Sequence, residues 1–245
     1  MEELVLSLFP GAGMLDRAFQ DEGFCVVRGP DLLWGGDVRS FRPPPGKFVG
    51  VIGGPPCQCF SALAPLNRSM GHEPTFGNLI PEFERCIQCA LPAWFLMENV
   101  RSAPMPNVDG YAVKARDVQD CRCGGETIRI RKFTFGGSSA AAELFDPVFS
   151  DSKPSAGRAV TCDRRLVTDK ERERTRKYDG GVLPHSGKIV GSAEMARLQG
   201  MPTDFLKHSP FTEAARRRMI GNGVPMAMGR TIAKAVRSCM ERAEL

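Results

Sequence analysis

A single cysteine, Cys57, stands where the sequence is best suited to covalent chemistry. It comes directly after Gly53-Gly54-Pro55-Pro56, which ends a short apolar run. Two prolines restrict the backbone just before the thiol and hold its sulfur in a defined direction. A thiolate is a strong nucleophile, although a cysteine with the usual pKa near ~8.5 is only slightly ionised at neutral pH. The alternative is a proline-stiffened turn with an incidental thiol, which would be preferred for a lone Pro-Cys pair.

An acidic residue at the end of another apolar run is a candidate partner for this thiol. Trp94-Phe95-Leu96-Met97 is typical of a strand, and Glu98-Asn99-Val100 follows at once. Because ligands of α/β sheets bind at the carboxyl ends of the strands, we expect Glu98 to lie near Cys57. A carboxylic acid that faces a thiol suits an addition reaction in which the attacked ring must also be protonated.

A glycine turn, Phe9-Pro10-Gly11-Ala12-Gly13, joins the first apolar run to a helical pattern. Its glycines let a ligand approach the backbone, although a tight turn without a ligand explains the pattern about equally well. Asp31 and Asp37 favour a ligand, because carboxylates at strand ends accept hydrogen bonds from ribose hydroxyls or an adenine amine. Asp16 replaces the third glycine of a dinucleotide fingerprint, which disfavours a nicotinamide cofactor.

Alternating strands and helices must position these residues. Apolar runs predict strands at residues 4–9, 24–27, 48–52 and 94–97, and helical spacing predicts helices after Gly13 and at residues 81–91. This alternation is typical of βαβ units and a mainly parallel sheet. The predicted fold class is therefore α/β, with the candidate residues at the carboxyl edge of the sheet.

The composition of the chain changes after residue 136. Residues 137–185 are richer in serine, proline, glycine and charge, so we interpret them as a small irregular insert. Helical patterns return at residues 192–198 and 226–240. The domain prediction is a catalytic domain made of residues 1–136 and 186–245, interrupted by the insert.

The overall composition excludes several classes of protein. No stretch approaches the ~20 apolar residues of a membrane span, and the first residues lack the basic region of a secretory signal, so we expect a cytoplasmic protein without a membrane partner. Nine cysteines are an odd set that argues against a disulfide framework, and with three histidines they lack zinc-finger spacing, so no metal is expected. A net charge of +5 is compatible with a polyanionic partner but does not establish one.

Seven segments resemble motifs of the cytosine-5 DNA methyltransferase family, in that family's order along the chain. They cover nearly the whole chain outside the insert, and the short connections resemble compact bacterial or phage members. The segments are Phe9-Pro10-Gly11-Ala12-Gly13, Gly36-Asp37, Pro55-Pro56-Cys57-Gln58, Glu98-Asn99-Val100, Arg129-Ile130-Arg131, Arg197-Leu198-Gln199-Gly200-Met201-Pro202 and Gly221-Asn222-Gly223-Val224-Pro225.

The resemblance implies the Rossmann-like fold of S-adenosylmethionine-dependent methyltransferases, with residues 137–185 as a target-recognition insert. It implies a DNA (cytosine-5-)-methyltransferase that moves a methyl group from S-adenosylmethionine to carbon-5 of a cytosine flipped out of duplex DNA, through a covalent Cys57 intermediate. Double-stranded DNA is the expected partner of a monomer, in a bacterial or phage-infected cell and in a restriction-modification setting.

The resemblance also implies roles for individual residues. Besides Cys57, the implied catalytic residues are Glu98, Arg129 and Arg131. The implied donor-binding residues are Phe9, Gly11, Ala12, Gly13, Asp31, Asp37, Pro55 and Asn222.

Two positions depart from the family pattern. Thr127 stands where the family has glutamine, and Ser7 stands where an acid often precedes Leu-Phe. These departures leave the chemistry in place and affect the details of donor contact.

Three other functions fit the sequence less well than a DNA cytosine-5 methyltransferase. An RNA (tRNA) cytosine-5 methyltransferase on the same fold is the nearest, and the Pro-Pro-Cys-Gln sequence and short insert fit a DNA enzyme better. A non-catalytic DNA-binding relative is expected to have lost Cys57, Glu98 or the donor glycines, all of which are present. A metal-dependent hydrolase lacks a cluster of histidines and carboxylates.

Overall fold

The computed structural model describes residues 4–61, 69, 71, 75–150 and 190–243. Within these ranges the strands form one mixed sheet in the order β2-β1-β3-β4-β6-β5. The first four strands of this order are parallel to one another, and β6 runs antiparallel to both of its neighbours, β4 and β5. The strands are β1 (Leu4–Leu8), β2 (Cys25–Arg28), β3 (Gly50–Gly53), β4 (Trp94–Asn99), β5 (Ala112–Gln119) and β6 (Ile130–Gly137).

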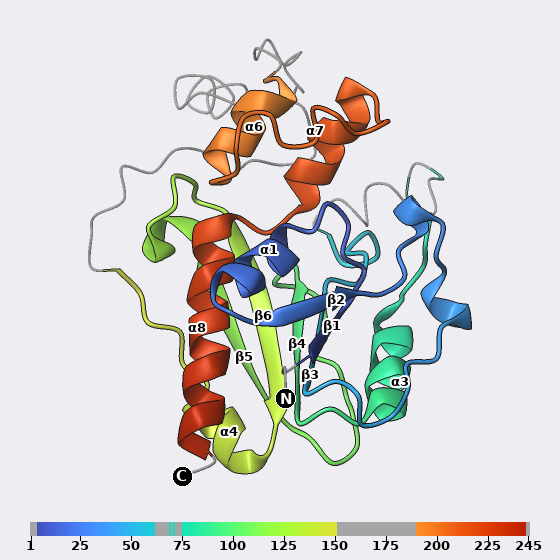
Figure 1. Ribbon diagram of the computed structural model, residues 1–245, viewed down its shortest axis with the longest axis vertical. Coiled ribbons are helices and arrows are strands. Elements are labelled where there is room, and N and C mark those ends of the chain that lie inside the picture. Colours follow the sequence, from blue (N-terminus) through green and yellow to red (C-terminus); the bar gives the residue numbers. More distant parts are fainter. Residues whose placement is uncertain (1–3, 62–68, 70, 72–74, 151–189, 244–245) are drawn as a thin grey trace.

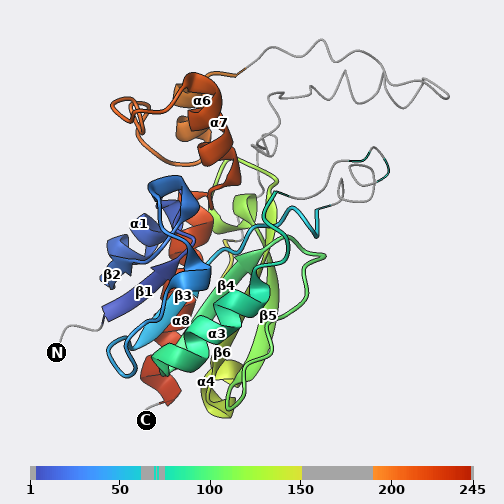
Figure 2. The same ribbon diagram turned by 90° about the vertical axis from the view of Figure 1, so that its right-hand side faces the viewer.

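Helices cover both faces of this sheet, as Figures 1 and 2 show. The helices α1, α4 and α8 lie on one face and α3 lies on the other, so the predicted α/β class is confirmed. They are α1 (Met14–Asp21), α3 (Ile80–Ala90), α4 (Ser139–Leu144), α6 (Ser192–Leu198), α7 (Glu213–Asn222) and α8 (Met226–Ala243), with short 3-10 turns η1 (Leu32–Trp34), η2 (Val38–Ser40) and η3 (Asp120–Cys123).

The burial of the strands explains their place in the sheet. Both β3 and β4 are buried on nearly every residue, because helices cover both faces, and a central parallel strand is therefore a continuous apolar run. The edge strand β2 is mostly exposed. Two cores result, one around Phe19, Trp94 and Phe135 beneath α1 and α8, and one around Phe83 and Ile87 of α3.

The C-terminal helices α6 and α7 form a small lobe beyond the carboxyl edge of the sheet (Figure 1). Its core is a separate cluster in which Met195, Ala196 and Ile220 are buried. The predicted helices at residues 192–198 and 226–240 are confirmed as α6 and α8, and α8 extends to Ala243.

The described start of the predicted insert belongs to the main body of the protein. Helix α4 packs against α8, β5 and β6, and Ala141, Ala142 and Phe145 are buried in the same core as Trp94. Ser138 caps this helix by accepting a hydrogen bond from the Ala141 backbone N–H. Residues 151–189, which make up most of the insert, lie outside the described residues.

Candidate active site at the carboxyl edge of the sheet

The sheet brings most of the predicted site residues to one edge. The strands β1, β2, β3 and β4 are parallel, so the segments that follow them lie at the same end of the sheet. Strand β6 runs in the opposite direction, and its register pairs Glu98 with Phe133 and Asn99 with Lys132. The start of β6 therefore places Arg131 beside the ends of the parallel strands.

The glycine turn after β1 has the backbone that its sequence requires. Gly11 has a φ of 53° and Gly13 a φ of 78°, which favour glycine, and Gly13 has no room for a Cβ because the Arg28 guanidinium lies against it. Phe9 also has a positive φ, of 56°, an uncommon conformation for a bulky residue that is found at functional sites. The space beside Gly11 is open, so a ligand can approach the backbone there.

A buried ionic cluster supports this turn from below. Asp16, in the first turn of α1, is 1% exposed and accepts hydrogen bonds from Ser7 Oγ at 2.5 Å and from Arg28 Nε at 2.9 Å. Burial raises the pKa of Asp16, and the hydrogen bonds from Ser7 and Arg28 oppose this effect. Ser7 stands where the resembling motif often has an acid, and here Asp16 of α1 places a carboxylate next to that position.

The two predicted donor-binding aspartates have different surroundings. Asp31 accepts hydrogen bonds from the Gly11 N–H and the Leu33 N–H, both at 2.8 Å, so it joins the end of β2 to the glycine turn. Asp37 is exposed and forms an ion pair with Arg39 at 2.7 Å, which lowers the pKa of Asp37. The lone pairs that remain on both carboxylates are available to ligand hydroxyl or amine groups.

Trp34 is a site residue that the sequence did not reveal. Its indole Nε1–H donates to the Gly11 carbonyl at 2.9 Å, and its ring lies 5.3 Å from that of Phe211, just before α7. The ring is half exposed. Trp34 therefore connects the glycine turn to the C-terminal lobe.

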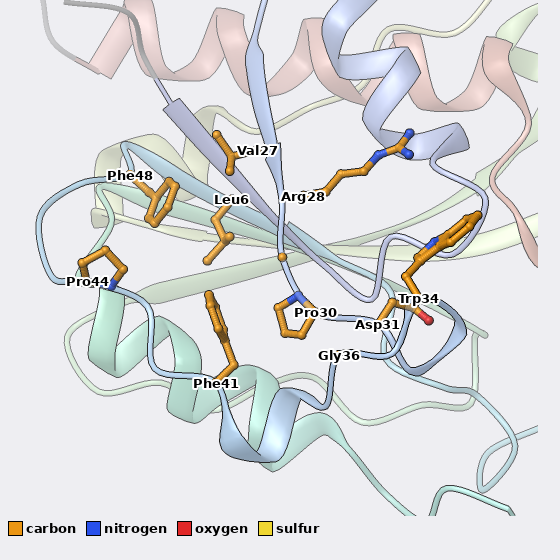
Figure 3. Close-up of a pocket in the computed structure, with 11 residues that line it drawn as sticks. Leu6, Val27, Arg28, Pro30, Asp31, Trp34, Gly36, Phe41, Pro44 and Phe48 are labelled. Carbon is orange, nitrogen blue, oxygen red and sulfur yellow. The ribbon is translucent and has the colours of Figure 1, made fainter.

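A cavity of about 410 Å³ begins at this end of the sheet (Figure 3). Asp31, Trp34 and Gly36 line the end of the cavity beside the glycine turn, which we call the donor end. The lining continues along the face of β1 and β2 to a group of apolar side chains, namely Leu6, Val27, Phe41, Pro44 and Phe48. The donor end has the polar groups expected of a nucleoside site.

The loop that carries Cys57 is fixed from both sides. Asn99, which is 1% exposed at the end of β4, donates its side-chain Nδ2–H to the Pro55 carbonyl at 3.1 Å. After the cysteine the chain turns, with the Phe60 and Ser61 N–H groups both donating to the Cys57 carbonyl at 2.9 Å. The Cys57 side chain remains partly exposed. Asn99 thus ties the thiol loop to the strand end that carries Glu98.

Glu98 and Arg131 form an ion pair at this edge. Arg131 Nε lies 2.9 Å from Glu98 Oε1, with exposed side-chain fractions of 20% and 12%. Burial raises the pKa of Glu98, and the positive charges of Arg131 and Arg129 oppose this effect only in part. A Cβ on Gly54 would lie 3.0 Å from Glu98 Oε2, so the loop before Cys57 passes directly over the acid. Glu98 therefore keeps its proton to a higher pH than an ordinary glutamate does.

Arg129 lies deeper than Arg131 and has a different set of partners. It is 2% exposed and donates to the Gly221 carbonyl at 2.7 Å and to the Asn222 carbonyl at 3.2 Å, at the end of α7. Arg129 therefore holds the α7 end beside β6. Asn222 itself is exposed at this end.

The Thr127 departure has a structural use. Thr127 is fully buried, and its N–H and Oγ1–H donate to Asp120 Oδ2 at 3.0 and 2.7 Å. These bonds close the connection between β5 and β6 just before Arg129. Burial raises the pKa of Asp120, and no local sequence signal pairs this acid with position 127.

Two kinds of site are not found in the described part of the chain. No group of three or more histidine, cysteine or acidic side chains there could hold a metal ion. None of the helices described is both long and apolar enough to cross a membrane.

Comparisons with known proteins match this chain to one family. The sequence profile of the C-5 cytosine-specific DNA methylase family matches residues 35–111 and 124–238. The chain is 34% identical over 126 residues to the type II methyltransferase M.AquIA of Picosynechococcus, covering 41% of this chain and 50% of that protein. It is 30% identical over 165 residues to M.HgiDI of Herpetosiphon aurantiacus, covering 54% of this chain and 51% of that protein.

Solved structures share the fold. The Entamoeba histolytica methyltransferase EhMeth aligns with a TM-score of 0.63 at 12% identity, covering 98% of this chain and 99% of that one. Spodoptera frugiperda DNMT2 aligns with a TM-score of 0.63 at 11% identity, covering 96% and 99%. A DNA modification methyltransferase encoded within an E. coli prophage gives 0.60 at 17% identity, covering 97% and 99%.

The chain belongs to the C-5 cytosine-specific DNA methylase family, because the profile matches well over half of its length. The predicted recognition and fold are confirmed. The matched segments span about half of M.AquIA and M.HgiDI.

Proposed function

We propose that the protein is a DNA cytosine-5 methyltransferase in which Cys57 is the covalent nucleophile and S-adenosylmethionine is the donor. The observation that carries this proposal is the assembly of thiol loop, acid and arginine at one sheet edge, where Asn99 holds Pro55 at 3.1 Å and Arg131 holds Glu98 at 2.9 Å. The family of the chain supports the same chemistry.

The donor site proposed here fits the residues that are present. Gly11 and Gly13 leave the turn open to a ligand, and the cavity beside it presents Asp31 and Gly36. Phe9, Ala12, Pro55, Asp37 and Asn222 complete the set that we assign to donor binding. The bound donor would supply a methyl group on a positively charged sulfur, which leaves as a neutral thioether.

The thiol and the acid divide the activation of the base between them. Cytosine carbon-5 is a poor nucleophile, so the Cys57 thiolate adds to carbon-6 and forms a carbon–sulfur bond. Glu98 gives its proton to ring nitrogen 3, and the electron pair moves to carbon-5. Carbon-5 then takes up the methyl group. Water takes the proton from carbon-5, and the electron pair of that bond forms the carbon-5–carbon-6 double bond and expels the Cys57 thiolate. Ring nitrogen 3 returns its proton to Glu98.

The two arginines have separate parts in this proposal. Arg131 orients Glu98 and has further N–H groups that can donate to the carbonyl oxygen of the base. A guanidinium suits this role because it stays charged at any working pH. Arg129 is a positioning residue, because it is buried and both of its terminal nitrogens donate to α7 carbonyls.

The proposed substrate is a cytosine flipped out of duplex DNA, because carbon-6 is hidden within the base stack. We assign reading of the DNA sequence to residues 151–185, beginning after α4 because α4 belongs to the core. A monomer and a cytoplasmic location in a bacterial or phage-infected cell stay predictions.

The test is covalent trapping by duplex DNA that contains 5-fluorocytosine at sites methylated in cells expressing the protein, as bisulfite sequencing identifies them. Fluorine cannot leave carbon-5 as a proton does, so we expect a donor-dependent adduct that survives denaturing electrophoresis. Cys57→Ala should form no adduct and transfer no methyl group while keeping its circular dichroism spectrum. Turnover by Cys57→Ala would contradict the mechanism, and a preference for tRNA over duplex DNA would favour the RNA alternative.

A further inference from the structure

The connection between β2 and β3 leaves one face of the sheet edge uncovered. Residues 29–49 are all described, and they contain the turns η1 and η2 but no α-helix. Leu6 of β1 and Val27 of β2 are register partners that line the cavity on the α3 side of the sheet. Leu6 is buried, whereas Val27 is 39% exposed.

This uncovered face is one wall of the cavity that begins at the donor end (Figure 3). We call the part of the cavity farther from the glycine turn the apolar groove, which is lined by Leu6, Val27, Phe41, Pro44 and Phe48. The whole cavity, at about 410 Å³, is in the size range of small-molecule sites.

One charged residue, Arg28, is among those that line the cavity, but its guanidinium points away from the groove (Figure 3). Arg28 is a neighbour of Val27, but its guanidinium pairs with Asp16 at 2.9 Å, and β-strand alternation directs it to the α1 side of the sheet. Asp31 is held at the other end by Gly11 and Leu33. An apolar group that enters from the donor end therefore meets only apolar side chains.

We propose that the apolar groove is a subsite for an apolar substituent on the adenine of a donor or donor analogue. This inference rests on the proposed function, which puts the nucleoside beside Asp31 and Asp37. An adenine whose amine carries one alkyl group keeps one N–H for a carboxylate acceptor. The substituent then extends along β1 and β2 into the groove.

The probes are S-adenosylhomocysteine and the same compound with a benzyl group on its adenine amine, with calorimetry on the full chain as the readout. We expect the wild type to bind the two within about threefold of each other. Val27→Trp fills the groove and should weaken the benzyl compound about tenfold or more while leaving S-adenosylhomocysteine unchanged. Val113→Trp is the matched control, because Val113 is 36% exposed on the opposite edge strand, and it should change neither affinity.

Each other outcome is informative. A wild type that binds S-adenosylhomocysteine but rejects the benzyl compound more than about tenfold overturns the inference and leaves the donor proposal intact. A folded Val27→Trp variant that loses both compounds places the adenine itself in the groove and also overturns it. A wild type that binds neither compound contradicts the donor proposal, and the inference with it. Val27→Phe gives the same comparison if the tryptophan variant does not fold.

Discussion

Two acids near the site are raised in pKa by burial, and the consequence differs between them. Glu98 is paired with Arg131 at the base-binding edge, where a retained proton is useful for addition to a ring. Asp16 lies beneath the glycine turn, where its charge has no chemical role and must be balanced by Arg28. One group therefore bears on activity and the other on stability.

Glu98→Gln should lower methyl transfer about 10²–10⁴-fold, because the amide keeps the shape but has no acidic proton to give. In the wild type, activity needs an ionised Cys57 and a protonated Glu98, so kcat/KM should fall at both low and high pH. Burial raises the pKa of Glu98, so this acid keeps its proton to a higher pH than an ordinary glutamate does. Initial rates with labelled donor, measured across pH, should show no decrease at high pH in Glu98→Gln. A variant with more than about a tenth of the wild-type rate would contradict the role.

Arg28→Ala should destabilise the fold by about 1–3 kcal/mol at neutral pH, since it leaves the buried Asp16 carboxylate short of a partner. The pKa of Asp16 is already raised by burial, and loss of Arg28 raises it further. An acid whose pKa is raised in the folded state lowers the stability of the protein as the pH rises. The loss of stability caused by Arg28→Ala should therefore be larger at pH 8 than at pH 5. Urea unfolding at both pH values measures it.

The control for this experiment is Arg28→Ala in an Asp16→Asn background. That background has no charge to balance, so the destabilisation should be smaller and independent of pH. Equal defects at the two pH values in the single variant would show that Arg28 acts through packing alone.

At the scale of elements, the turn before α8 and the start of α1 fit together through one pair of residues. A Cβ on Gly223 would lie 2.3 Å from Met14 Sδ, and Met14 is 1% exposed. The family motif that this segment resembles has alanine where Gly223 stands, so the long Met14 side chain takes the space of that methyl group.

Gly223→Ala should destabilise the protein by about 1–3 kcal/mol, because the new methyl group overpacks the contact with Met14. In a Met14→Ala background the same change should be neutral or stabilising, since it partly fills the space that Met14 leaves. Thermal unfolding of the four proteins in a double-mutant cycle measures this coupling. Additive effects would show that the two residues do not compete for space.

The central strands could be predicted from the sequence because their signals are local. Apolar runs that end in Gly54-Pro55-Pro56-Cys57 and Glu98-Asn99-Val100 mark both a strand and its carboxyl end. Strand β5, Ala112–Gln119, could not be predicted in this way. Three of its eight residues are charged and only Val118 is buried, so this edge strand has no apolar run. Its pairing with β6 supplies the order that its own sequence does not.

Other parts of the site depend on contacts between distant segments. Trp34 lies in a glycine-rich stretch without periodicity, and only the fold brings it to Gly11 and Phe211. Arg129 and Arg131 share one motif, yet the structure buries the first against α7 and leaves the second beside Glu98. The motif therefore located both arginines but could not separate their partners.

At the scale of the whole molecule, the C-terminal lobe has a small core of its own and depends on the main body for its position. Gln199 Nε2–H donates to the Ile220 carbonyl, and the Met226 N–H donates to the Gln199 carbonyl at 2.9 Å. Arg129 adds the bonds from β6 to the α7 end. In the described residues, the Arg129 bonds and the ring contact between Trp34 and Phe211 thus join the lobe to the main body.

Arg129→Gln should loosen this junction, because the shorter amide cannot reach both carbonyls. We expect faster hydrogen exchange at the α7 end, because the free energy of local opening there should fall by about 1–3 kcal/mol. Exchange in β3 and β4 should change little. Arg131→Gln is the matched control and should reduce activity without changing exchange in α7. Equal exchange in both variants would contradict the separation of roles.

The acid and the arginine of the site come from strands that run in opposite directions, and the ladder between β4 and β6 sets their distance. A slip of one residue would turn Arg131 to the other face, and a slip of two would move it by roughly 7 Å. A slip of two would keep each side chain on its own face of the sheet, so it need not change the helical content. A preparation with full helical content could therefore include molecules unable to turn over, so a count of reactive centres measures correct pairing better than a folding spectrum does.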